Sequence, residues 1–312
     1  MTNLSNYKEL ENNGVRHGLV LKKDSIIAEG SPPRGIIYSE SGSFFMAHLR
    51  ADGEWGRGRL FRGPSLMGLA KGPQTSAYFV WALEPCIPQI FDSEVINQTD
   101  LYSKIAEAQT NDRRHLALLA AALTGKKQPK DRVSAIFSFL TENGKIPTPV
   151  TLKQPRIALL AGISRQHMNK AIKQLEKDGQ IVKEGTSRNY RYWFKGEIDL
   201  DREASKFSQL DEAELLMRVE ALQSKFIEEK LAYWLSYQID RAQDPLPKIT
   251  KSKLAFELNV GRSRLNETIN HWIDRGLITV SRGSYHASET GIQAINSIKE
   301  GLEFSEIRKI VG

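Results

Sequence analysis

The side chains best suited to molecular recognition gather in one short segment, residues 163–181, with the sequence ISRQHMNKAIKQLEKDGQI. At helical spacing its apolar residues Met168, Ile172 and Leu175 fall on one side. The polar side chains that then face outward are Arg165, Gln166, Asn169, Lys170 and Lys173. Arginine can donate two hydrogen bonds to guanine, and glutamine or asparagine can pair with adenine. Lysine is suited to phosphate contacts. The segment therefore predicts binding to double-stranded DNA.

The flanking residues predict a helix-turn-helix followed by a β-hairpin. Residues 155–161 form a short helix, Gly162 supplies the turn, and Ser164 can cap the second helix through its hydroxyl. Gly179 ends that helix, and IVKEGTSRNYRYWF predicts two strands joined by a basic loop. This order is typical of a winged helix-turn-helix, whose second helix enters the major groove. The predicted DNA-binding residues are Ser164, Arg165, Gln166, Asn169, Lys170, Lys173, Ser187 and Arg188.

A second segment, residues 260–278, aligns with the first without a gap at an offset of 278 − 181 = 97 positions. Apolar size and the terminal glycine are kept while the polar residues differ, as in two diverged copies of one fold. The corresponding candidate DNA-binding residues are Arg262, Ser263, Arg264, Asn266 and Arg282. A winged helix used for packing or dimerisation is the alternative, because Glu267 and Asp274 lie near the same side.

The distribution of charge agrees with these two segments. The net charge is +7, and residues 151–195 hold ten Lys/Arg against three Asp/Glu, an excess of seven. Residues 248–286 hold seven against three, an excess of four, whereas residues 1–100 hold ten against eleven. Concentrated basic charge is expected where phosphates are bound.

The rest of the chain predicts an α+β protein of several domains. Residues 15–92 are short β-prone runs broken by glycine, which predict an antiparallel sandwich or barrel. Few breakers interrupt residues 92–123, which predict one long helix, and residues 199–240 are again helical. The predicted domains are an antiparallel sheet domain at 1–92, a long helix and hinge at 93–127, a winged helix-turn-helix at 128–198, and a helical linker with a second winged helix at 199–312.

Several function classes are not expected. The chain has no Walker-type phosphate loop, no GxSxG and no HExxH, and its six histidines are scattered, so we predict neither an enzyme nor a metal site. A single cysteine, Cys86, excludes an internal disulfide. No apolar run reaches the length of a membrane helix, and the polar N-terminus does not resemble a signal peptide. We expect a cytoplasmic protein with no membrane partner.

Residues 15–196 resemble the cyclic-AMP receptor protein / Fnr family of transcription regulators. The resemblance rests on KKDSIIAEG, IIYSESGSFFMAHL, GRLFRGPSLMGLA and WALEPCIPQIF, then DRVSAIFSFL and the LLAGISRQHMNKAIKQLEKDGQIV stretch. It implies a cyclic-nucleotide-binding-like β-roll, a homodimer formed through the long helix, and a palindromic operator. It also implies that Arg165, Gln166 and Lys170 contact bases. RNA polymerase is a further candidate partner.

The chain departs from the family at the effector pocket. Cyclic-nucleotide binders carry a Gly-Glu-Leu and then an Arg-Ser pair that holds the phosphate. Here the candidate pocket residues are Gly68, Leu69, Ala70, Thr75 and Ser76, which include neither the glutamate nor the arginine. A cyclic phosphate would meet no pairing charge there, so we expect no cyclic AMP binding, predict no cofactor, and leave any other effector open.

The sequence therefore predicts a homodimeric DNA-binding transcription regulator with a degenerate sensor domain. The alternative is a plasmid-type replication initiator, a class in which tandem winged helices also occur. The first hundred residues discriminate between the two, because an initiator of that kind would begin directly with a winged helix.

Overall fold

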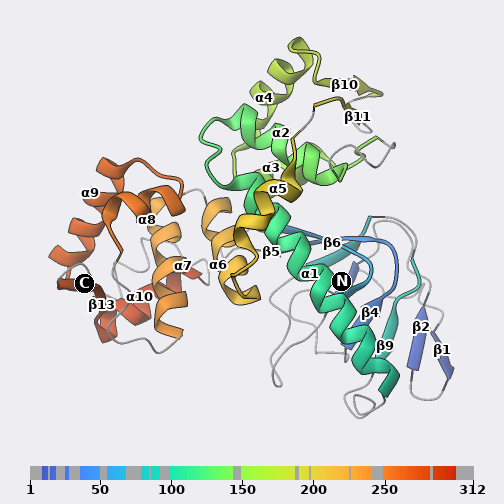
Figure 1. Ribbon diagram of the computed structural model, residues 1–312, viewed down its shortest axis with the longest axis horizontal. Coiled ribbons are helices and arrows are strands. Elements are labelled where there is room, and N and C mark those ends of the chain that lie inside the picture. Colours follow the sequence, from blue (N-terminus) through green and yellow to red (C-terminus); the bar gives the residue numbers. More distant parts are fainter. Residues whose placement is uncertain are drawn as a thin grey trace. The chain divides into compact units, whose positions relative to one another are not determined.

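The structure is a computed structural model. It describes residues 9–12, 15–18, 25–27, 36–49, 55–67, 79–83, 86–91, 99–142, 149–186, 190–196, 198–224, 226–240, 249–281 and 284–299. The chain divides into two compact units, residues 1–49 with 58–115 and residues 50–57 with 116–312. The predicted mixture of helices and antiparallel sheets is confirmed (Figure 1). The finer division into four domains stays a prediction.

The first unit is built on two sheets of short strands. Their strand orders are β1-β2-β9-β4-β7 and β3-β8-β5-β6. The strands are β1 (Glu9–Asn12), β2 (Val15–Gly18), β3 (Ser25–Ile27), β4 (Ile36–Ser39), β5 (Ser43–Leu49), β6 (Trp55–Arg62), β7 (Ser65–Met67), β8 (Phe79–Ala82) and β9 (Gln89–Phe91). Alternation along β5 and β8 sends Phe44 and Val80 into a core that also holds Ile37 and Cys86.

A long helix, α1 (Thr99–Leu123), follows the sheets. Within the first unit its polar side chains hold the turn between β6 and β7. The Asn111 amide donates to the carbonyls of Arg62 and Pro64 at 2.7 and 2.8 Å, and an Asp112 carboxylate oxygen accepts from the Leu66 amide at 3.3 Å.

The apolar end of α1 is buried within the chain. For this helix the sequence predicts more apolar surface than one sheet face would cover, and it leaves open whether the chain's own sheet domain or the same helix of a second subunit covers it. Leu116 and every residue from Leu118 to Leu123 are buried in the single chain. The described exposed positions of α1 are mostly polar, among them Glu107, Gln109 and Arg113. The apolar segment is therefore covered within the chain, which is one of the two possibilities that the sequence leaves open, and the homodimer stays a prediction.

The second unit contains both repeated segments. Its elements are α2 (Pro129–Leu140), α3 (Gln154–Ala161), α4 (Arg165–Lys177), β10 (Ile181–Glu184), β11 (Arg191–Phe194), α5 (Leu200–Ala204), the 3-10 helix η2 (Ser205–Phe207), α6 (Glu212–Gln223), α7 (Ile227–Asp240), α8 (Lys251–Glu257), α9 (Arg262–Asp274), β12 (Ile278–Ser281), β13 (Ser284–Ala287) and α10 (Glu289–Lys299). We call residues 154–194 the first repeat unit and residues 251–287 the second repeat unit.

The sequence predicts that the helices between the repeat units are a linker. In the structure they also pack against the second repeat unit. Helix α7 packs against α9 and α10 (Figure 1). Its Leu231, Trp234 and Leu235 share one core with Ile269 and Trp272 of α9. These helices therefore supply much of the hydrophobic core of the second repeat unit, which its own short elements could not bury alone.

Two buried cations join the first repeat unit to α6 and α7. The Arg132 guanidinium, on α2, donates to the carbonyls of Ala161 at the end of α3 and Leu222 in the last turn of α6, at 3.0 and 3.2 Å. The Lys230 ammonium, on α7, donates to the carbonyls of Ala221 and Leu222 at 2.7 and 3.3 Å. Carbonyls in the last turn of a helix lack intrahelical donors and carry partial negative charge, so they are suitable partners for cations.

The buried lysine makes stability depend on pH. Burial, followed by the charge of Arg132, lowers the pKa of Lys230 to about 7, and Glu229 opposes this shift. Between pH 7 and the unfolded pKa of about 10.4 the unfolded chain binds more protons, so stability rises with pH. We expect the free energy of unfolding to increase by about 2 kcal/mol more from pH 7 to pH 9 in the wild type than in Lys230→Met.

Urea unfolding at the two pH values measures this difference. Lys206→Met, which alters an exposed lysine, serves as the matched control and should keep the wild-type dependence. Equal pH dependence in the wild type and Lys230→Met would show that Lys230 titrates normally.

Candidate nucleic-acid interface

Helix α4 begins where the sequence placed its start. Ser164 lies in an extended conformation, and its hydroxyl accepts a hydrogen bond from the backbone N–H of His167 at 3.3 Å. Gly162 precedes it with a positive φ of 61°, and Gly179 follows the helix with φ 70°. The predicted cap, turn and stop are confirmed.

The apolar and polar residues of α4 lie on opposite sides of the helix, as the periodicity of the sequence predicts. Met168, Ile172 and Leu175 are buried. The outer side presents Arg165, Gln166, Asn169, Lys170 and Lys173, all exposed. The structure therefore brings the five predicted side chains onto one accessible helix, with Ser164 half-buried at its start. An apolar stripe opposite a polar one fixes the side that faces solvent.

The β10–β11 hairpin follows this helix in the sequence and packs through aromatic side chains. Ile181 pairs with Phe194 and Glu184 with Arg191 in an antiparallel register. Tyr192 is buried against Phe137 of α2, with ring centroids 5.5 Å apart. The predicted residues at the tip, Ser187 and Arg188, lie outside the described residues.

The hairpin also holds cations that the sequence analysis did not select. Arg191 is exposed on β11, and Lys195 follows that strand at another exposed position. The Lys183 ammonium instead lies 3.8 Å from the centroid of the Tyr190 ring, in a cation–π contact. Strand alternation around buried Tyr192 would have placed Arg191 outward, because neighbours along a strand face opposite sides.

An acidic residue at the end of α4 is already engaged. Asp178 forms an ion pair with Lys130 of α2 and accepts a hydrogen bond from Gln174 at 2.8 Å. The hydrogen bonds from Lys130 and Gln174 lower the pKa of Asp178. Its charge is thus compensated, which leaves the positive charge of Arg165, Lys170 and Lys173 as the main charge on the outer side of the helix.

The second repeat unit has the same order of helices and strands as the first, but different exposed side chains. Arg262, Ser263 and Arg264 are exposed at the start of α9, but Glu267 and Asp274 are exposed on the same helix. The residue before α9 is Gly261, which provides no side-chain cap. Predicted Arg282 lies outside the described residues.

Asn266 differs from its counterpart Asn169. It is half-buried, and its amide oxygen accepts a hydrogen bond from the Lys251 ammonium of α8. An asparagine that pairs with adenine needs both its oxygen and its nitrogen. Because the oxygen is engaged, Asn266 does not present the free amide edge that the sequence analysis expected.

The candidate effector residues cannot be placed. Gly68, Leu69, Ala70, Thr75 and Ser76 all lie outside the described residues. Within the described ranges, no cluster of His, Cys, Asp or Glu has the composition of a metal site. No helix in that part of the chain is both long and apolar enough to cross a bilayer.

Comparison with known proteins gives structural neighbours only. Neither a protein-family model nor a curated protein matches the sequence. A CRP/FNR-family transcriptional regulator from Thermus thermophilus is 20% identical, with a TM-score of 0.45, over 61% of this chain and 98% of that chain. FixK2 from Bradyrhizobium japonicum is 16% identical, with a TM-score of 0.42, over 60% and 96%. CLP, a c-di-GMP-responsive global regulator from Xanthomonas campestris, is 16% identical, with a TM-score of 0.43, over 59% and 95%.

The different caps of α4 and α9 predict opposite responses to substitution. Ser164→Ala removes the acceptor for the His167 N–H and should lower the free energy of unfolding by about 1 kcal/mol. Gly261→Ser adds an acceptor where a new Cβ would meet no atom within 4 Å, and should raise it by a few tenths of a kcal/mol. Chemical denaturation measures both changes, and a stabilising Ser164→Ala would contradict the assignment of this cap.

Proposed function

We propose that this chain is a DNA-binding transcription regulator whose first repeat unit is a winged helix-turn-helix that contacts operator bases. The observation that carries this proposal is the exposed row on α4: one arginine, two amides and two lysines on a helix whose other side is buried. Arg165, Gln166 and Asn169 supply the hydrogen-bonding edges that distinguish bases in the major groove. Lys170, which the family resemblance implies as a further base contact, can donate to guanine, and Lys173 supplies charge for phosphates.

The local architecture supports the same role. Helix α4 is fixed at its start by the Ser164 cap and along its inner side by buried apolar residues, so its outer side chains are presented by a rigid element. Exposed Arg191 and Lys195 extend the basic surface onto the hairpin strands. A helix flanked by a hairpin allows base contacts from one element and phosphate contacts from the other.

The remaining parts of the proposal rest on the sequence. We propose that the first unit is a sensor-like domain that does not bind cyclic AMP, and that the regulator acts in the cytoplasm as a homodimer on a palindromic operator near RNA polymerase. The replication-initiator alternative is not favoured, because strands β1–β9 precede the first helix-turn-helix in the chain.

Arg165→Ala tests base contact by the first repeat unit. We expect binding to weaken by about 1–3 kcal/mol on an operator selected in vitro, and to change little on random DNA, because a bidentate base contact is specific to sequence. Fluorescence anisotropy at fixed salt measures both affinities. Lys206→Ala, outside the two repeat units, is the matched control. Equal effects on both DNAs would make Arg165 a phosphate contact instead.

The second repeat unit should act on DNA through phosphates, because Asn266 is engaged while Arg262 and Arg264 are exposed. We expect Arg262→Ala and Arg264→Ala each to flatten the dependence of log affinity on log salt, by about 0.9 for every phosphate that the variant no longer neutralises. Base preference should be unchanged. An unaltered slope in the double variant Arg262→Ala/Arg264→Ala would assign this unit to packing or to binding of a partner protein.

A further inference from the structure

The two helix-turn-helix turns occupy equivalent positions but carry different residues. Position 162 is glycine and position 259, its equivalent at 259 − 97 = 162, is asparagine. Both have positive φ, 61° and 53°. A left-handed conformation is uncommon for any residue with a Cβ, although asparagine tolerates it better than most. The surroundings of each position show why glycine occurs at one and asparagine at the other.

At Gly162 the explanation is close backbone approach. A Cβ there would lie 2.5 Å from the Gln223 Cα and 2.8 Å from the Leu222 carbonyl oxygen. The Gln223 side chain reaches back and donates to the Leu160 carbonyl at 3.2 Å. The first turn is thus pressed directly against the end of α6, and only glycine fits.

At Asn259 the explanation is a hydrogen bond made by the side chain. Its amide nitrogen donates to the Lys126 carbonyl at 3.0 Å, across 133 positions in sequence. Lys126 lies in the short connection between α1 and α2. The same carbonyl accepts from the Arg132 Nε at 2.8 Å. One carbonyl oxygen therefore receives a donor from α2 and a donor from the turn of the second repeat unit.

Arg132 connects this carbonyl to the first turn. While its Nε donates to Lys126, its Nη1 donates to the carbonyls of Ala161 and Gly162 at 3.0 and 3.4 Å. The guanidinium is rigid and planar, so the two ends of this bridge cannot move independently. Both helix-turn-helix turns are linked to Lys126, one through Arg132 and the other through Asn259.

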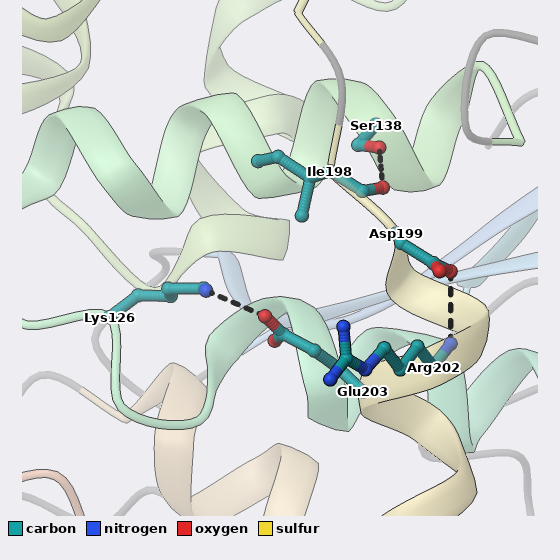
Figure 2. Close-up of polar contacts among 6 residues, drawn as sticks. All are labelled: Lys126, Ser138, Ile198, Asp199, Arg202 and Glu203. Atoms are coloured by element: carbon teal, nitrogen blue, oxygen red, sulfur yellow. Dashed lines mark hydrogen bonds and ion pairs between the residues drawn. The ribbon is translucent and has the colours of Figure 1, made fainter.

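The side chain of Lys126 adds a separate tie to α5. Its ammonium lies 3.3 Å from a Glu203 carboxylate oxygen. Figure 2 shows this pair together with the Asp199 carboxylate that caps Arg202 and the Ser138 hydroxyl that donates to the Ile198 carbonyl at 2.9 Å. Since both side chains are partly exposed to solvent, the ion pair contributes little by itself. The carbonyl bonds are the better candidates for the coupling.

We propose that Asn259 and Arg132 are positioning residues that lock the two repeat units to each other through the Lys126 carbonyl, so that both meet DNA in one fixed arrangement. This inference rests on the proposed function for its consequence, but the lock itself is a property of the protein alone. Because Lys126 lies in the short connection between α1 and α2, this connection is also where both turns are held.

The distance between the two repeat units tests the lock without DNA. In a Cys86→Ala background, spin labels are placed at exposed Lys173 and Asn270 by cysteine substitution, and the distance distribution is measured by pulsed electron resonance. We expect one narrow distribution, which Asn259→Gly should broaden. Glycine accepts the φ of 53° without strain, so this variant removes the amide and leaves the turn.

Two further variants keep the test decisive. Asn259→Asp retains size and turn preference but cannot donate, so it should broaden the distribution as glycine does. Glu203→Gln weakens the α5 ion pair while leaving the Lys126 carbonyl bonds, and should leave the distribution narrow. Circular dichroism confirms folding of each variant. An unchanged distribution in Asn259→Gly and Asn259→Asp, or equal broadening in Glu203→Gln, would overturn the lock.

Binding to DNA then separates the lock from the proposed function. On an operator selected in vitro, Asn259→Gly should lower affinity by about tenfold or more, because an uncoupled second module contributes a lower effective concentration. Broadened distances with unchanged affinity would support the lock and remove its role in DNA binding. A wild-type protein that binds no DNA would refute the proposed function, while the spin-label result would still decide the lock.

Discussion

The second unit depends on one buried cation. Arg132 is only 7% exposed, and burial lowers its pKa to about 10, so it stays protonated at neutral pH. A buried charge is costly unless its donors are satisfied, and here the acceptors are backbone carbonyls of the α1–α2 connection, the end of α3 and the last turn of α6. Satisfying one guanidinium therefore requires three segments far apart in sequence to meet. Lys230 reinforces the meeting point from α7 through the same Leu222 carbonyl.

This constraint explains why the duplicated segments have diverged in the way they have. The buried apolar positions are shared, because each copy must close its own core: Met168 corresponds to Leu265, and Ile172 to Ile269, all fully or nearly fully buried. The turns differ because they have different neighbours. Gly162 lies against the backbone at the end of α6, whereas the Asn259 side chain donates to the Lys126 carbonyl. The outer residues differ again, since Asn169 of α4 is exposed while its counterpart Asn266 of α9 accepts a hydrogen bond from Lys251.

Reasoning from the sequence was most reliable where the signal was local. The start, turn and end of α4 follow from Ser164, Gly162 and Gly179, whose preferences act over a few residues. It was least reliable for apolar surface that another element covers. For the apolar end of α1 the sequence left open whether the chain itself or a second subunit covers it, and it predicted α6 and α7 to be a linker. Most residues of these segments are buried within the chain. Periodicity shows that the apolar side of a helix must be covered, but it does not show which element or which chain covers it.

The sequence by itself determined the two repeat units, their apolar stripes and the exposed basic row on α4, because helix periodicity and capping depend on neighbouring residues alone. It did not show that Arg132 is buried, that Asn266 is engaged, or that Asn259 donates to a carbonyl 133 positions earlier in the chain. Those facts depend on contacts between segments distant in sequence, which only the tertiary structure brings within hydrogen-bonding distance. A long polar side chain has the same local preferences whether its partner is water, DNA or a buried carbonyl. The contacts of these three side chains were therefore decided by the packing of distant segments.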